Sequence, residues 1–94
     1  MNETWRFADP KNVAVITTKQ VMREHQPILF VSHDADDGAW QFHTGEPVDE
    51  DDAMIVGLAR VVELDKSLYE LADLPLGWSA WRESVGQPWQ REER

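Results

Sequence analysis

The sequence predicts one α+β domain: a mostly antiparallel sheet of four or five strands, with two short helices packed on one face. The chain has 94 residues, a length typical of a single domain. Short runs of β-branched and aromatic residues are separated by turns rich in Gly, Pro and Asp, as in small sheets. Two segments begin with a helix-capping residue. We expect the domain to span residues 1–94, with an ordered core over about residues 10–90 and a frayed tail over residues 91–94.

The first half of the chain predicts three strands and a helix. Val13 to Ile16 is a short apolar run typical of a strand, and Thr17 or Thr18 can cap a helix that reaches about His25. A second apolar run, Ile28 to Val31, suits a central strand. The segment from residue 39 to residue 43 alternates, and a polar turn over residues 33–38 joins these two strands into a predicted hairpin.

The second half contains one ambiguous segment. Met54 to Leu64 fits both a helical stripe and a strand alternation, and we favour a strand from about Leu58 to Glu63. Asp65 is a good cap for a helix from Lys66 to about Ala72. Residues 78–83 and the segment from residue 89 onward predict a last hairpin. The predicted buried side chains are Val15, Ile28, Phe30 or its neighbour Leu29, Trp40, Phe42, Leu68 and Leu71.

Charge is the most unusual feature of the composition. The chain has 18 acidic and 9 basic residues, and its net charge is −9. No Lys or Arg lies between Glu24 and Ala59, a segment with nine carboxylates that accounts for the whole excess. Such a field repels nucleic acid and anionic membranes and attracts basic proteins, although it can also serve solubility alone. Candidate binding residues are therefore the carboxylates of the loop that precedes Met54: Glu46, Asp49, Glu50, Asp51 and Asp52.

Catalytic and metal chemistry find little support. Cysteine is absent, so thiolate sites and a thiol nucleophile are excluded. The Asp34–Gly38 turn has its glycine in the wrong place for a calcium loop, and we expect no metal site and no cofactor. His33, His43 and Asp34 are the best available acid–base set, but no catalytic spacing accompanies them.

Two tryptophans are further binding candidates. Trp78 and Trp81 are three positions apart, so both cannot face inward from one straight strand. We therefore expect one of them at the surface, where an exposed Trp is a plausible binding anchor.

Three stretches resemble a family of small bacterial proteins, part of which is classed as immunity proteins of polymorphic-toxin systems (the immunity protein thirty-three class). They are Val13–Thr17, Asp37–Glu46 and Leu74–Arg82, and the resemblance covers roughly residues 10–90. The most specific piece is Trp40-x-Phe42-x-x-Gly45-Glu46. Val31–His33 departs from the family, which has an aromatic followed by a basic residue there. The resemblance implies the fold more than a function, and it brings no catalytic residues.

The leading expectation is a non-catalytic acidic binding or accessory protein, and toxin neutralisation is its most specific form. The partner would be a basic protein such as a toxin domain, not nucleic acid and not a membrane. The alternatives are a housekeeping domain whose acidity serves solubility, and a small enzyme that uses His33, His43 and Asp34. The first residues lack a basic start followed by an apolar stretch, so we expect a cytoplasmic protein.

Overall fold

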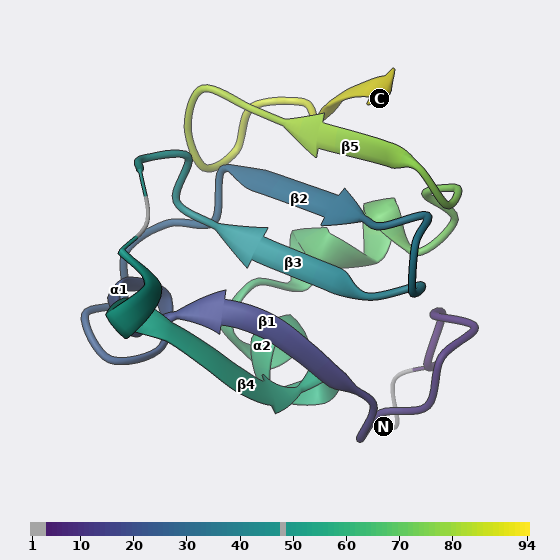
Figure 1. The fold of residues 1–94 in the computed structure, drawn as a ribbon. Helices are drawn as coiled ribbons and strands as arrows, with labels where there is room; N and C mark the ends of the chain where they lie inside the picture. Colours follow the sequence, from purple (N-terminus) through teal and green to yellow (C-terminus); the bar gives the residue numbers. More distant parts are fainter. Residues whose placement is uncertain (1–3, 48) are drawn as a thin grey trace.

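The computed structural model describes residues 4–47 and 49–94; residues 1–3 of the predicted domain and Val48 of the predicted acidic loop lie outside this range. The described residues form an α+β fold around one six-stranded sheet, with strand order β4-β1-β3-β2-β5-β6 (Figure 1). The strands are β1 (Ala14–Thr18), β2 (Phe30–His33), β3 (Trp40–His43), β4 (Ala53–Gly57), β5 (Trp78–Trp81) and β6 (Gln90–Glu93). The helices are α1 (Lys19–Met22) and α2 (Leu58–Leu64), and the 3₁₀ helices are η1 (Glu50–Asp52) and η2 (Lys66–Leu71).

The α+β class is confirmed, but the strand count and the pairing differ from the prediction. The sheet has six strands instead of four or five, and β1 runs parallel to β3 while the other four neighbouring pairs are antiparallel. β1 and β3 are parallel because β3, the second strand of the β2–β3 hairpin, lies between β1 and β2. The chain turns back through the short α1, so β2 runs opposite to β1. The hairpin then returns β3 between them, in the direction of β1.

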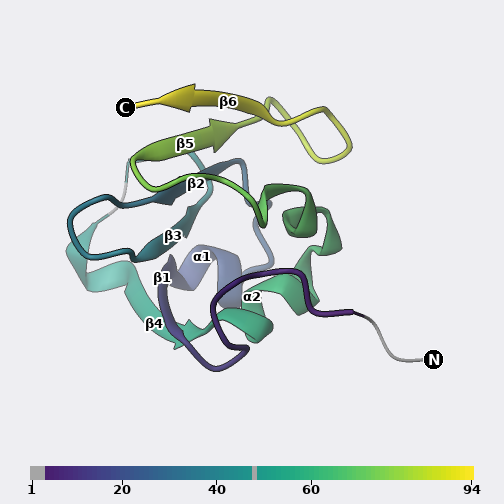
Figure 2. The ribbon, with the colours of Figure 1, turned by 90° about the vertical axis from the view of Figure 1, so that its right-hand side faces the viewer.

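The helices α1, α2 and η2 lie on one face of the sheet, as predicted (Figures 1 and 2). Thr18 begins α1 as expected, because its hydroxyl accepts a hydrogen bond from the Val21 N–H at 3.3 Å. The core between the helices and the sheet contains Phe7, Val31, Trp40, Phe42 and Leu58 among others. Burial of apolar area between these layers is the main stabilising term of such a fold.

Most of the predicted core is confirmed. Val15, Ile28, Trp40, Phe42, Leu68 and Leu71 are all buried. Phe30 and Leu29 are only partly buried, so this part of the prediction is wrong. Val31 occupies the core position of that strand instead. Side chains alternate across a strand, so an inward Val31 directs Phe30 to the opposite face.

The ambiguous segment divides at Gly57, and the strand predicted from Leu58 to Glu63 is wrong. Residues 53–57 form β4, which pairs with β1, and Leu58 to Leu64 form α2. Leu58, Val61 and Val62 face the core from α2, which is the helical stripe that the sequence also contains.

No helix among the described residues is long and apolar enough to cross a membrane.

Most of the tail that was predicted to fray belongs to a strand. Residues 90–93 form β6, which pairs antiparallel with β5, so the predicted last hairpin is confirmed and extends further than expected. Two ion pairs hold the strand: Arg91 contacts Asp73 at 2.7 Å, and Arg94 contacts Asp34 at 3.3 Å. The hydrogen bond from Arg91 and its positive charge lower the pKa of Asp73 below its ordinary value. Backbone pairing therefore orders a segment whose side chains are all exposed.

Candidate functional site

All five predicted acidic residues belong to the connection between β3 and β4, whose described residues, 44–47 and 49–52, we call the acidic loop. Glu46, Asp49, Glu50 and Asp51 are exposed, and Asp52 is half-buried. Asp49 begins η1, because its carboxylate accepts the Asp51 N–H at 3.1 Å. This capping bond begins a single turn that gathers the four consecutive carboxylates of Asp49–Asp52 at one end of the sheet (Figure 1).

No ion pair between described residues neutralises these carboxylates. The ion pairs of the described residues involve Arg82, Arg91 and Arg94, all of which bind acids outside the acidic loop. Asp52 accepts a hydrogen bond from the neutral Gln20 amide at 2.9 Å. The acidic loop therefore presents a net negative charge to solvent, carried mainly by its four exposed carboxylates, where it can attract a basic molecule.

The structure places Trp78 and Trp81 on opposite faces of the sheet. Trp78 packs against the core beside Ala80, whereas Trp81 is 41% exposed on the face opposite to α1, α2 and η2. We call this the open face; it is turned toward the viewer in Figure 1. The expectation that one of the two tryptophans lies at the surface is confirmed for Trp81. Trp78 begins β5 and packs against the core, so it does not lie beside the acidic loop.

Trp81 belongs to a row of side chains across the open face. Phe30 is paired with Trp81 on β5 and with His43 on β3. The rings of Phe30 and His43 lie 6.5 Å apart. β3 ends at His43 and leads directly into the acidic loop, so this aromatic row and the carboxylates share one end of the sheet (Figure 1). The sequence did not indicate the role of Phe30, because its apolar run looked buried on both faces.

A polar chain lies beside this row on the open face. Gln41 donates its amide N–H to the Asp34 carboxylate at 2.6 Å, and its carbonyl oxygen contacts His43 Nε2 at 2.9 Å. The carbonyl oxygen can only accept, so His43 carries its proton on Nε2. Nδ1 of His43 is buried and has no hydrogen-bond partner among the described residues. Burial lowers the pKa of His43, and the negative charge of Asp34 opposes this effect.

The acid–base set of His33, His43 and Asp34 is not assembled. His33 lies on the packed face, where its ring stacks 3.9 Å from Trp40 and its Nδ1 donates to the Leu74 carbonyl at 2.7 Å. His43 lies on the open face, on the other side of the sheet. Of the two histidines, Asp34 is linked to His43, through the side chain of Gln41, and its carboxylate also pairs with Arg94. In the described part of the chain, no group of three or more His, Cys, Asp or Glu side chains is placed to hold a metal ion.

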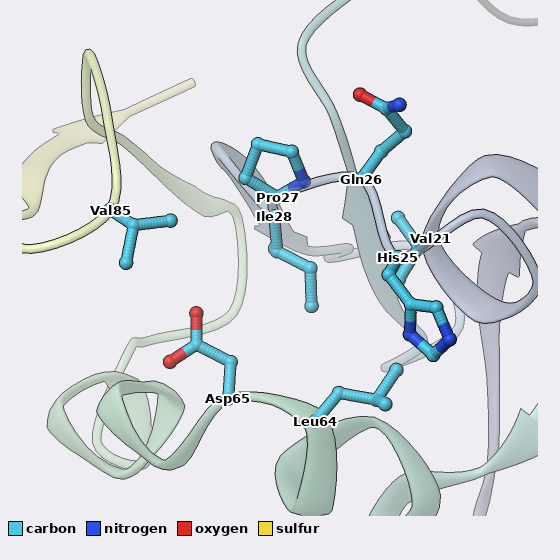
Figure 3. A pocket seen from close by; sticks show the side chains of 8 residues that line it. All are labelled: Val21, His25, Gln26, Pro27, Ile28, Leu64, Asp65 and Val85. Carbon is cyan, nitrogen blue, oxygen red and sulfur yellow. The ribbon is translucent and has the colours of Figure 1, made fainter.

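A shallow hollow of about 440 Å³ lies at the other side of the molecule, between the α1–β2 connection and the start of η2 (Figure 3). Its lining is largely apolar, with Val21, Ile28, Leu64 and Val85. Asp65 at its edge is already bonded to Arg82 and Ser67. The hollow thus offers an apolar surface, with no free acid to pair with a base.

Comparison with protein-family models, with curated proteins and with solved structures found no match.

Proposed function

We propose that this protein is a non-catalytic binding protein whose acidic loop and open-face aromatic row together engage a basic partner protein. One observation carries the proposal: five carboxylates that form no ion pair with another described residue lie at the same end of the sheet as the exposed Trp81. The two features are complementary in what they contribute to an interface. Charges steer and orient a partner, and a large aromatic side chain supplies the desolvated anchor.

The electrostatic contribution acts mainly on the rate of association. Four consecutive carboxylates on one turn create a local negative field that a basic surface meets before contact. Steering of this kind raises association rate constants toward about 10⁸ M⁻¹s⁻¹ at low ionic strength. Screening over about 8–10 Å at physiological salt weakens it. The partner would therefore bind more slowly as salt is added.

The aromatic contribution acts mainly on the lifetime of the complex. Trp81 and Phe30 are neighbours on adjacent strands, and both are rigid apolar side chains on the open face. Burial of Trp81 in a pocket of the partner would exclude water from the centre of the contact. Tryptophan is strongly enriched among the residues that dominate binding free energy.

The partner class that fits best is a toxin domain that acts on nucleic acid. Such a domain needs a basic cleft for the phosphate backbone, and the carboxylates of the acidic loop could occupy that cleft in place of phosphates. The resemblance of residues 10–90 to immunity proteins supports this assignment. Toxin neutralisation in the cytoplasm is the role that we propose, and an acidity that serves solubility alone is the competing explanation.

Zero-length carbodiimide cross-linking tests which carboxylates meet the partner. The tagged protein would be captured with its partner from its own cells and cross-linked. Mass spectrometry would then identify the carboxylates joined to partner lysines. The proposal predicts cross-links at Glu46 and within Asp49–Asp52. Cross-links spread evenly over exposed acids on other elements, such as Glu24, Glu63 and Glu83, would contradict it.

A further inference from the structure

The sheet ends in two edge strands that differ sharply in sequence. β6 is Gln90-Arg91-Glu92-Glu93, whose charged side chains protect an edge against pairing with another chain. β4 is Ala53-Met54-Ile55-Val56-Gly57, with no charge and no proline. Its only sheet neighbour among the described residues is β1. β4 therefore has an unprotected edge.

The backbone of Ile55 is directed toward this free edge. Just beyond the β1–β4 ladder, the Leu58 N–H donates to the Val13 carbonyl at 2.9 Å. Hydrogen-bonded pairs alternate along an antiparallel ladder, so the backbone amides of Val56 and Met54 also point toward β1. The N–H and C=O of Ile55 then point away from the sheet. Its side chain is 76% exposed on the open face.

Charge is distributed unequally along the same edge. The acidic loop, with Asp49 to Asp52, immediately precedes β4 and outweighs the single Lys19 beside it. Beyond the other end of β4 lies the exposed Arg60, and Lys11 is beside it, since its carbonyl accepts the Ala59 N–H. An edge that is acidic at its start and basic at its end is complementary to itself in the antiparallel direction.

We propose that two copies of this chain associate through β4, antiparallel about a two-fold axis at Ile55. The Ile55 amide of each copy would donate to the Ile55 carbonyl of the other. Ala53 would lie opposite Gly57, and Glu50 would be level with Arg60 of the second copy. Such an isologous contact closes on itself and joins the two sheets into one.

The side chains support this register. Ile55 lies beside Ile16 on the open face, where the two are cross-strand partners. In the dimer, the two Ile55 side chains meet at the axis with one Ile16 on either side, forming an apolar cluster. The most exposed large apolar side chain of the described residues is thereby covered.

Analytical ultracentrifugation from about 1 µM to about 1 mM protein tests the proposal. The wild-type mass should rise with concentration from 10.9 kDa toward twice that value. Ile55→Lys should remain monomeric throughout. Val85→Lys is the matched control, because Val85 is 63% exposed on the β5–β6 connection, far from β4 in the sheet order. It should dimerise like the wild type, and circular dichroism would show that both variants are folded.

A charge exchange tests the orientation of the two strands. Glu50→Arg and Arg60→Glu should each weaken dimerisation, and the double variant should recover it. The Ile55 amide should also exchange its hydrogen more slowly at high protein concentration. A wild-type chain that stays monomeric at about 1 mM, or an Ile55→Lys variant that dimerises as well as the wild type, would overturn the proposal.

Discussion

Arg82 and Asp65 form a buried ion pair that joins the end of β5 to the start of η2. The guanidinium also donates to the Ile28 carbonyl and the Ser67 hydroxyl, and it lies 4.2 Å from the Trp89 ring. Its side chain is 1% exposed, so every donor must find a partner inside the protein. This one side chain therefore links the α1–β2 connection, the start of η2 and the β5–β6 hairpin.

Asp65→Ala should lower the free energy of unfolding by about 3–5 kcal/mol, because it leaves the buried Arg82 charge without its counter-ion. It also removes the cap of η2. Chemical denaturation measures the change. Asp73→Ala breaks the exposed pair with Arg91 and serves as the control, with little expected effect. Equal losses of unfolding free energy for the two variants would show that the buried pair stabilises the fold no more than the exposed pair does.

Trp40→Ala should lower the free energy of unfolding by about 3–5 kcal/mol. Trp40 is buried between Phe7, His33 and Phe42, and its indole N–H donates to Asp9 at 2.9 Å. The substitution removes both the packing and the hydrogen bond that ties the N-terminal segment to β3. An unchanged denaturation midpoint would contradict the assignment of this face of the hairpin to the core.

The lowered pKa of His43 predicts a specific pH dependence. The unfolded chain binds a proton more readily than the folded chain, so the free energy of unfolding should fall as the pH drops through and below about 6.5. His43→Gln should flatten the curve of unfolding free energy against pH in this range. The measurement is urea denaturation at several pH values, and equal slopes for wild type and His43→Gln would contradict the assignment.

Trp81→Ala should leave the fold intact and weaken partner binding about 30-fold, the loss typical of a central anchor. The faster dissociation rate should account for most of the change. Leu76→Ala is the matched control, because Leu76 is 56% exposed but lies before β5, at the opposite end from Trp81. Surface plasmon resonance with the captured partner measures both rates. Equal losses for the two variants would remove Trp81 from the proposed interface.

Local patterns predicted the elements whose signals are local. The Asp65 cap, the Thr18 cap and the β2–β3 hairpin were all visible in neighbouring residues. Met54 to Leu64 was assigned wrongly in part because β4 is an edge strand with no buried residue and two of five exposed, so no buried face separates it from the following helix. Gly57 marks the boundary, and nothing in its local sequence distinguishes it from a glycine inside a strand.

Long-range pairing explains the other differences. β6 has no apolar pattern at all and is ordered by backbone pairing with β5 and by Arg91 and Arg94. Spacing likewise does not reveal that His33 and His43 lie on opposite faces, since the hairpin register decides this. The acidic residues could be singled out by composition. Their place beside Trp81 and Phe30 depends on the strand order, which the sequence does not state.

The central proposal, that the acidic loop faces a basic partner, is tested most directly by two variants of equal net charge. One neutralises Glu46, Asp49, Glu50, Asp51 and Asp52 with Gln and Asn. The other neutralises five exposed acids on other elements: Glu24, Asp36, Glu63, Glu70 and Glu83. Each change removes five of the 18 acidic residues and brings the net charge from −9 to −4.

The measurement is the association rate with the captured partner at about 50 mM and about 300 mM salt. The acidic-loop variant should associate more slowly than wild type, most clearly at low salt, because local steering charge is lost. The matched variant should behave like wild type at both salt concentrations. Equal association rates for the two variants would contradict the account and assign the acidity to solubility.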